Sequence, residues 1–146
     1  MSDQIYTAAV KQEREHIAEV ISAAIGWAAD KDAERLYWAV VNDERLFIFH
    51  PDAHSTIHGF AAFKRMIENT FLKPSFRATG FEIKHLEIQM SASGTVAWYT
   101  CLLDDRSEWN GVPSAWIDVR WTGVLEKFGS QWKIMQMHFS KAEAEK

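Results

Sequence analysis

The sequence has little cysteine and no long apolar run. Cys101 is the only cysteine among 146 residues, so the chain can form neither an internal disulfide nor a cysteine-ligated zinc cluster. No run of about eighteen apolar residues occurs, which argues against a membrane-spanning helix. The first residues, MSDQIYTAAVKQERE, also lack the apolar segment of a signal peptide. We therefore expect a cytoplasmic protein without a membrane partner.

Basic residues are not in excess either. The chain has 16 Lys and Arg residues against 20 Asp and Glu residues, with a formal net charge of -4. Without a basic stripe, a nucleic-acid partner is not expected. A glycine-rich phosphate loop, a nucleophile elbow and an HExxH motif are also missing, which argues against nucleotide hydrolysis, serine-hydrolase chemistry and zinc proteolysis. We expect no cofactor.

Aromatic residues are the feature that the chain has in excess. Seven tryptophans and nine phenylalanines supply large contact areas with few rotatable bonds, which is typical of aromatic-walled cavities and apolar interfaces. The length of 146 residues suits a single domain, 1–146, whose core is large enough to need no disulfide.

Hydrophobic periodicity predicts helices first and a strand meander afterwards. The expected elements are helices to about residue 29, over about 31–42 and over 59–73, a short strand at 46–49, and strands over 76–90, 95–103 and 114–140. This order predicts an α+β fold in which the helices cover one face of an antiparallel sheet.

The last of these segments, SAWIDVRWTGVLEKFGSQWKIMQMHFS, predicts a hairpin around the Phe128-Gly129 pair. Lys127 then faces Ser130, and Arg120 faces Met137, because directly paired residues share a face. Strict alternation gives one mixed face: Trp116, Asp118, Arg120, Thr122, Lys133, Met135, Met137 and Phe139. The opposite face is mostly apolar: Ile117, Val119, Trp121, Leu125, Trp132, Ile134, Gln136 and His138.

The predicted sheet has more apolar surface than its own helices can cover. The strand VAWYTCL at 96–102 is apolar on both faces, and helices on one side leave the other side exposed. A symmetric second subunit is the commonest cover for such a face. We therefore expect a homodimer that packs through Trp121, Trp132, Ile134 and His138.

Histidines cluster after the short strand. His50, His54 and His58 recur at intervals of four, which on a helix would align three metal ligands. Pro51, Ser55 and Thr56 make the segment a loop instead, so surface histidines are expected and a metal site is not. His50 closes the strand at the mouth of the sheet, where a neutral imidazole can act as a base near neutral pH. A histidine that is merely hydrogen-bonded is the alternative.

Two charged residues stand on the mixed face of the hairpin. Asp118 and Arg120 are two residues apart and so are about 7 Å apart on one face. They form either a structural ion pair or an anchor for an anion or carbonyl, in which Arg120 donates hydrogen bonds within an apolar surround. Met135 and Met137 are either core residues or an adaptable pocket wall.

The element order and three sequence patterns resemble the NTF2-like superfamily, and most closely its SnoaL-like branch. The patterns are NDERLFIFHPDAHSTIHGFAAFKRMIENTF, VAWYTCLL and DVRWTGVLEKFGSQWKIMQMHFS. The resemblance implies a cone, in which a curved sheet wraps around helices and encloses a pocket, with a dimer formed through the outer face of the sheet.

Two branches of the superfamily suggest positions of interest. In the related ketosteroid isomerases, a carboxylate base follows the first strand, near His50, and a second acid stands about where Arg120 does. In the related association domain of calcium/calmodulin-dependent protein kinase, pocket arginines would fall at Lys64, Thr100 and Phe139.

The leading hypothesis is a homodimer that holds an unidentified small, partly apolar ligand in the cone. His50, Arg120 and Asp118 are the candidate catalytic residues for isomerisation, dehydration or hydrolysis of a small carbonyl compound. The predicted ligand-binding residues are Trp38, Lys64, Trp98, Thr100, Trp116, Met135, Met137 and Phe139. The alternative is a non-catalytic oligomerisation or protein-interaction module whose cavity is filled by its own side chains.

Overall fold

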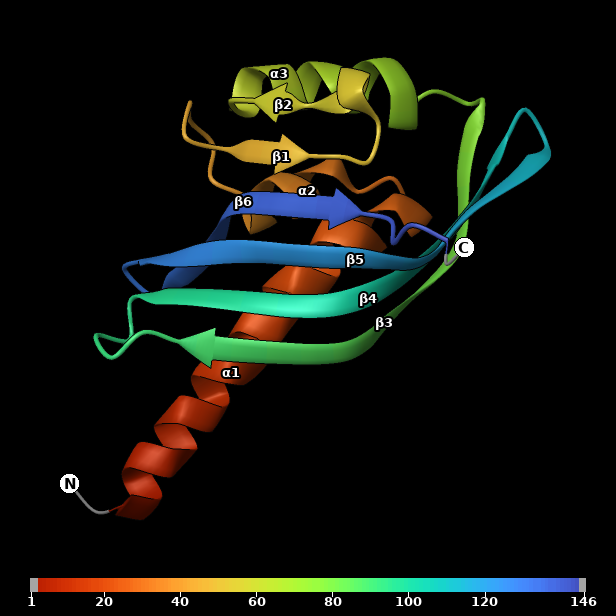
Figure 1. The fold of residues 1–146 in the computed structure, drawn as a ribbon. Coiled ribbons are helices and arrows are strands. Elements are labelled where there is room, and N and C mark those ends of the chain that lie inside the picture. Colours follow the sequence, from red (N-terminus) through yellow and green to blue (C-terminus); the bar gives the residue numbers. More distant parts are fainter. Residues whose placement is uncertain (1–2, 145–146) are drawn as a thin grey trace.

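The computed structural model describes residues 3–144 and shows a curved sheet with helices on one side (Figure 1). The helical elements are α1 (Asp3–Gly26), the 3-10 turn η1 (Trp27–Ala29), α2 (Ala33–Ala39), the 3-10 turn η2 (Ala53–Ser55), α3 (Phe60–Met66) and the π-helical turn η3 (Ile67–Phe71). The strands are β1 (Phe47–Phe49), β2 (Ile57–His58), β3 (Phe76–Met90), β4 (Val96–Trp109), β5 (Val112–Phe128) and β6 (Gln131–Ser140). None of the described helices is long and apolar enough to cross a membrane.

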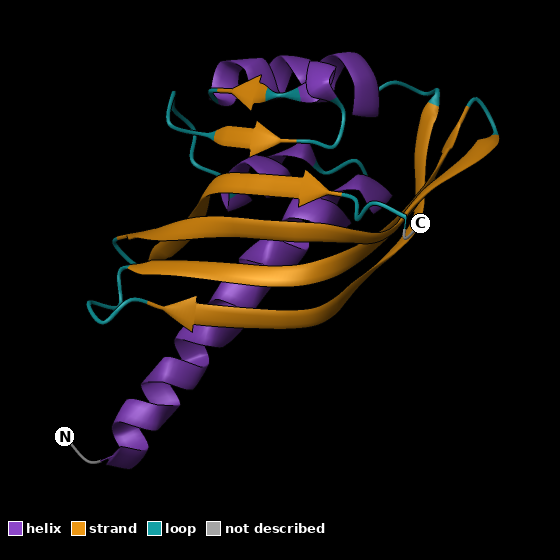
Figure 2. Cartoon of the chain, in the orientation of Figure 1, coloured by secondary structure: helices purple, strands orange, loops and turns teal. Residues whose placement is uncertain are grey.

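The six strands form one sheet in the order β2-β1-β6-β5-β4-β3. Neighbouring strands are antiparallel except β1 and β6, which run parallel. The sheet is therefore mixed, whereas an antiparallel sheet was predicted. Figure 2 shows the long strands curving around α1, with the short strands and α3 at one end of the sheet. The predicted α+β cone is confirmed.

Extra residues bend the long strands. The pairing of β3 with β4 shifts by one residue between Ala78 and Gly80 and again between Lys84 and Glu87. The pairing of β4 with β5 shifts at Asp104, and that of β5 with β6 shifts at Met135. Such β-bulges bend a strand and increase its twist, and Figure 1 shows β3, β4 and β5 turning sharply near the end of the cone.

The predicted register of the final hairpin is wrong. Phe128 pairs with Gln131 and the turn lies at Gly129 and Ser130, two residues from the predicted pairing. Arg120 pairs with Ser140 instead of Met137. Because each bulge inserts one residue, it also exchanges the inner and outer positions beyond it.

This exchange reverses the predicted orientation of Arg120 and Trp121. Arg120 is exposed on the outer face, whereas Trp121 is fully buried and stacks on Phe139 at 5.3 Å between ring centroids. Trp132 and Ile134 are also fully buried within the single chain. The prediction that Trp121, Trp132 and Ile134 form a subunit interface is therefore wrong, because these side chains are part of the core. His138, the fourth predicted residue, is exposed.

Helix α1 is fastened to the closing hairpin through Glu13. Its carboxylate accepts hydrogen bonds from Lys127 Nζ at 2.6 Å and from Trp132 Nε1 at 2.5 Å. Burial raises the pKa of Glu13, but these two hydrogen bonds and the charge of Lys127 outweigh it and leave the pKa below its usual value. The contact places Ile17, Val20 and Ile21, all fully buried, against the sheet.

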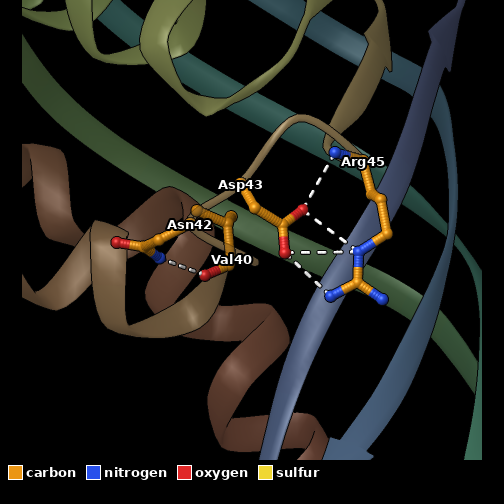
Figure 3. Close-up of polar contacts among 4 residues, drawn as sticks. All are labelled: Val40, Asn42, Asp43 and Arg45. Atoms are coloured by element: carbon orange, nitrogen blue, oxygen red, sulfur yellow. Dashed lines mark hydrogen bonds and ion pairs between the residues drawn. The ribbon is translucent and has the colours of Figure 1, made fainter.

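The loop from Val40 to Leu46 positions the start of β1 (Figure 3). The Asp43 carboxylate accepts hydrogen bonds from the Arg45 backbone N–H at 2.9 Å and from the Arg45 guanidinium at 2.8 Å, and the Asn42 side chain donates to the Val40 carbonyl at 2.6 Å. The Asp43 carbonyl also accepts the Phe60 N–H at 3.0 Å, which joins this loop to the first turn of α3.

Gly123 is required by the side chain of Tyr99, its partner on the neighbouring strand. A Cβ atom at Gly123 would lie 2.5 Å from the Tyr99 hydroxyl oxygen and 2.7 Å from the Gln136 carbonyl oxygen. We expect Gly123→Ala to lower the unfolding free energy by about 1–3 kcal/mol, because the packed core must move to admit the methyl group. Urea denaturation measures this change.

Gly80→Ala is the matched control in β3. No atom lies within 4 Å of a Cβ built there, so its unfolding free energy should change by less than about 0.5 kcal/mol. Equal stabilities of the Gly123 and Gly80 variants would contradict the close packing at Tyr99.

Candidate functional site

A cleft of about 680 Å³ opens between η2, the end of α3 with η3, and the bent ends of β4 and β5. Its lining is mostly aromatic on one side, with Phe71, Trp109 and Trp116, and polar at the rim, with Asp52, His54 and Lys141. A cleft of this size suits a small organic molecule.

A smaller chamber of about 100 Å³ continues the site toward the core. It shares His50, Met66, Phe71 and Trp116 with the cleft. Its remaining walls come from α1, η1, α3 and the inner face of the sheet and include Trp27, Phe76, Asp105, Met137 and Phe139. The site therefore narrows from a polar rim to an apolar inner end.

The π-helical turn η3 places aromatic side chains at the site. The Leu72 N–H donates to the Ile67 carbonyl at 3.0 Å, five residues earlier, and single π turns of this kind are common at functional sites. Phe71 then lies among Trp27, Phe76 and Trp109, at centroid distances of 6.4, 4.9 and 5.8 Å. The sequence predicts a helix here, although the π turn is not evident from periodicity.

His50 follows β1 and lines both cavities. Phe49 pairs with His138 on β6, so the His50 ring stacks on Phe139 with 5.4 Å between centroids and 2° between planes. Its Nδ1 lies 2.7 Å from the Ser55 carbonyl oxygen. A carbonyl only accepts hydrogen bonds, so Nδ1 carries the proton and Nε2 of the neutral ring keeps a free lone pair.

Burial lowers the pKa of His50 and outweighs the hydrogen bond to Ser55, which raises it. The ring is therefore neutral at neutral pH. This state and the tautomer set by Ser55 suit a general base.

Asp105 is a site residue that the sequence analysis did not identify. It pairs with Trp116 across β4 and β5 and lines the inner chamber. Burial raises the pKa of its carboxyl group to about 6. The predicted strand ended at residue 103 and so left Asp105 in a loop, whereas β4 continues to Trp109. The Asp104-Asp105 pair directly after an apolar strand was the signal that could have identified it. If the strand continues, one of two neighbouring residues must face the inner side of the sheet.

Asp104 points the other way. Its carboxylate accepts a hydrogen bond from the Asp118 N–H at 2.9 Å and forms an ion pair with Lys84 at 2.9 Å. The hydrogen bond from Asp118 and the contact with Lys84 lower the pKa of Asp104. Two adjacent aspartates thus have pKa values shifted in opposite directions.

The structure brings four of the sequence-predicted residues together. His50, Trp116, Met137 and Phe139 all line the inner chamber. The bulges explain why these residues share one side with Trp132 and Ile134, which strict alternation had placed on the opposite face.

The two charged candidates lie outside the cavities. Asp118 is exposed, forms an ion pair with Lys84 and has a positive φ of 52° at the bulge. The Arg120 guanidinium donates to Ser140 Oγ at 3.0 Å and to the Lys141 carbonyl at 3.3 Å. The predicted inward orientation of this pair is wrong, because the extra residue at Ile117 and Asp118 shifts the alternation of β5, so that Arg120 faces outward although Trp116 faces the cavity.

The other predicted ligand-binding residues are also elsewhere. Trp98 and Thr100 are exposed on the outer face of the sheet, and Lys64 is exposed on α3, 3.9 Å from Glu68. Trp38 stacks on His16 at 6.3 Å, and Met135 is the extra residue of the bulge in β6. Within residues 3–144, no group of three His, Cys, Asp or Glu side chains is arranged to hold a metal ion.

The sequence pattern of the SnoaL-like domain matches residues 17–144. The chain therefore belongs to the SnoaL-like domain family and has the NTF2-like fold described above. Among curated protein sequences, none matches the chain.

Solved structures share the fold at low sequence identity. An NTF2-like superfamily protein from Salmonella enterica serovar Typhimurium has a TM-score of 0.78 and 16% identity, covering 92% of this chain and 94% of its own. A provisionally named scytalone dehydratase from Novosphingobium aromaticivorans also has a TM-score of 0.78 and 16% identity, with coverages of 91% and 86%. A CaMKII hub from S. rosetta has a TM-score of 0.65 and 22% identity, with coverages of 88% and 95%.

Asp105→Asn is expected to stabilise the protein at neutral pH. The folded-state pKa of about 6 lies above the ordinary value of 3.8, so ionisation above pH 6 costs folding free energy that disappears below pH 3.8. The variant should gain about 1–3 kcal/mol of unfolding free energy at pH 7.5 and almost nothing at pH 4. Urea denaturation at both pH values measures the difference.

Asp104→Asn tests the neighbouring carboxylate and should act in the opposite direction. Its lowered pKa stabilises the fold above pH 3.8, and this contribution is lost as the pH falls through the lowered value. The variant should therefore be less stable than the parent at pH 7.5. Destabilisation by Asp105→Asn at that pH would contradict the chamber-facing position of Asp105.

Proposed function

We propose that the protein binds a small, largely apolar carbonyl compound and moves protons on it without a cofactor. The main support for this proposal is that His50 and Asp105 line the same chamber and have pKa values shifted toward each other. The pKa of His50 is lowered from 6.5, and that of Asp105 is raised to about 6. Paired groups whose environments shift their pKa values in this way are typical of acid–base sites.

His50 acts as the base and Asp105 as the acid. An apolar ligand displaces water from the chamber, which raises the pKa of Asp105 further and lowers that of His50 further, because both charged forms lose solvation. The bound state therefore favours a protonated Asp105 and a neutral His50. Nε2 of His50 takes a proton from the carbon next to the carbonyl, and Asp105 gives its proton to a departing hydroxyl group or to a developing enolate.

The aromatic walls hold the body of the ligand. Trp116 and Phe139 lie 5.3 Å apart between ring centroids and both contact the His50 ring. The open cleft supports ligand binding over the alternative of a module whose cavity is filled by its own side chains. The Novosphingobium structure is named as a dehydratase, and dehydration is one of the reactions proposed here. At 16% identity this relative supports the fold alone.

We also propose that the protein forms a homodimer through the outer face of the sheet. One row across four strands contains no Asp, Glu, Lys or Arg side chain and consists of Thr100, Thr122, His138 and Phe49. Trp98, Val124, Gln136 and Phe47 form the next row. Trp98 and Phe49 are 44% and 42% exposed, which suits a covered interface better than open solvent. The hub domain among the structural relatives agrees with oligomer formation.

His50→Ala should lower catalysed proton exchange by about 10²–10⁴-fold, because the base is removed. Small cyclic ketones and β-hydroxy carbonyl compounds are incubated with the protein in D₂O, and nuclear magnetic resonance follows deuterium uptake next to the carbonyl. For the compound that exchanges fastest, Asp105→Asn should also lower the rate of deuterium exchange. In the parent protein this exchange rate should fall as the pH rises above 6, because Asp105 then loses the proton that it donates.

His16→Ala is the control for the loss of an imidazole, because His16 stacks on Trp38 away from the cavities. It should exchange at the parental rate. Exchange by His50→Ala at the parental rate would remove His50 from the mechanism.

Trp98→Glu should convert the dimer into a monomer, because it places a charge within the apolar outer face. Light scattering after size-exclusion chromatography measures the mass. Lys64→Glu, an exposed change on α3, should leave the mass unchanged. A Trp98→Glu protein with the mass of the parent dimer would refute this interface.

A further inference from the structure

We propose that the ligand carries an anionic group, such as a carboxylate, that pairs with Lys141 at the mouth of the cleft, and that Arg120 positions Lys141 there. This inference rests on the proposed function, because it assigns the substrate class of the same cleft. The ligand is then an amphipathic acid whose uncharged, largely apolar end, with the reacting carbonyl group, lies in the inner chamber.

Lys141 is placed at the rim by the end of β6. Phe139 faces the chamber, and Ser140, the last residue of the strand, faces the outer side. Lys141 follows and lines the cleft together with its aromatic wall. Lys141 is exposed, and none of the ion pairs among the described residues includes it. Its ammonium group is therefore available to a ligand in the cleft.

Arg120 acts on this segment from the outer face. Its guanidinium donates one hydrogen bond to the Ser140 side chain and one to the Lys141 carbonyl, so it fixes the backbone where the chain leaves the sheet. No ion pair among the described residues includes Arg120. Arg120 is thus a positioning residue that does not contact the ligand.

The remaining charges set the direction in which an anion enters. The Asp52 carboxylate accepts hydrogen bonds from the His54 N–H at 3.0 Å and from the Ser55 hydroxyl at 3.3 Å, so it is engaged within η2. The inner end is walled mostly by apolar side chains around Asp105, so an anionic group placed there would lose its solvation without a cation to pair with. An anionic ligand consequently enters with its apolar end first and keeps its charge at the rim, near Lys141.

Two fluorescent compounds that differ only in charge test this arrangement. 8-Anilinonaphthalene-1-sulfonate carries a sulfonate, and N-phenyl-1-naphthylamine has the same aromatic body without it. Lys141→Met should weaken binding of the sulfonate by about three- to fivefold, the effect of one exposed charge pair, and leave the neutral compound unchanged. Arg120→Met should show the same selective loss, and higher salt should reduce the difference.

Two further variants separate this inference from the proposed function. Lys64→Met removes a charge outside the cavities and should bind both compounds as the parent does. Trp116→Ala removes a cleft wall and should weaken both compounds. If Trp116→Ala binds both compounds as the parent does, the apolar cleft is not the binding site, and the proposed function fails together with this inference.

If Trp116→Ala weakens both compounds but Lys141→Met leaves the sulfonate unaffected, or weakens both compounds equally, the anionic substrate class is overturned and the proposed function stands. If Arg120→Met binds the sulfonate as tightly as the parent, its positioning role is overturned. Circular dichroism confirms that each variant is folded before binding is measured.

Discussion

The bulge where β4 pairs with β5 is the constraint on which the site depends. One extra residue at Ile117 and Asp118 lets Trp116 face the cavity while Val119 and Trp121 face the core. Lys84 on β3 and the carboxylate of Asp104 hold this irregular segment on the outer face. Without the extra residue, regular alternation could not point both Trp116 and Trp121 into the cone, because they are five residues apart.

The same bend creates two different environments for two adjacent carboxylates. Asp104 faces outward, where a backbone N–H and an ammonium group lower its pKa. Asp105 faces inward, where the lost solvation of its charged form raises its pKa to about 6. The proposed acid, Asp105, and the structural ion-pair residue, Asp104, can be neighbours in the sequence, because successive residues of a strand face opposite sides of the sheet. The proposed chemistry depends on that separation.

Particular residues show how far the sequence could predict the site. His50 was identified because proline follows it at the end of a short strand, and both features are local. Trp116, Met137 and Phe139 were expected at the cavity from unbroken alternation, and they reach it although two bulges interrupt the alternation between them. Arg120 and Trp121 were expected on the wrong faces for the same reason, since a single inserted residue reverses every position after it.

The sequence by itself determined the class of the fold, the order of its elements and its family, because helical and strand periodicity act over neighbouring residues. Only the tertiary structure decided which side of each strand faces the cavity and which carboxylate becomes the acid. Those outcomes depend on contacts between distant segments, such as that of Lys84 with Asp118, 34 residues apart. The periodicity of a sequence cannot predict such contacts, because the interactions that stabilise a bulge come from neighbouring strands that are distant in the sequence.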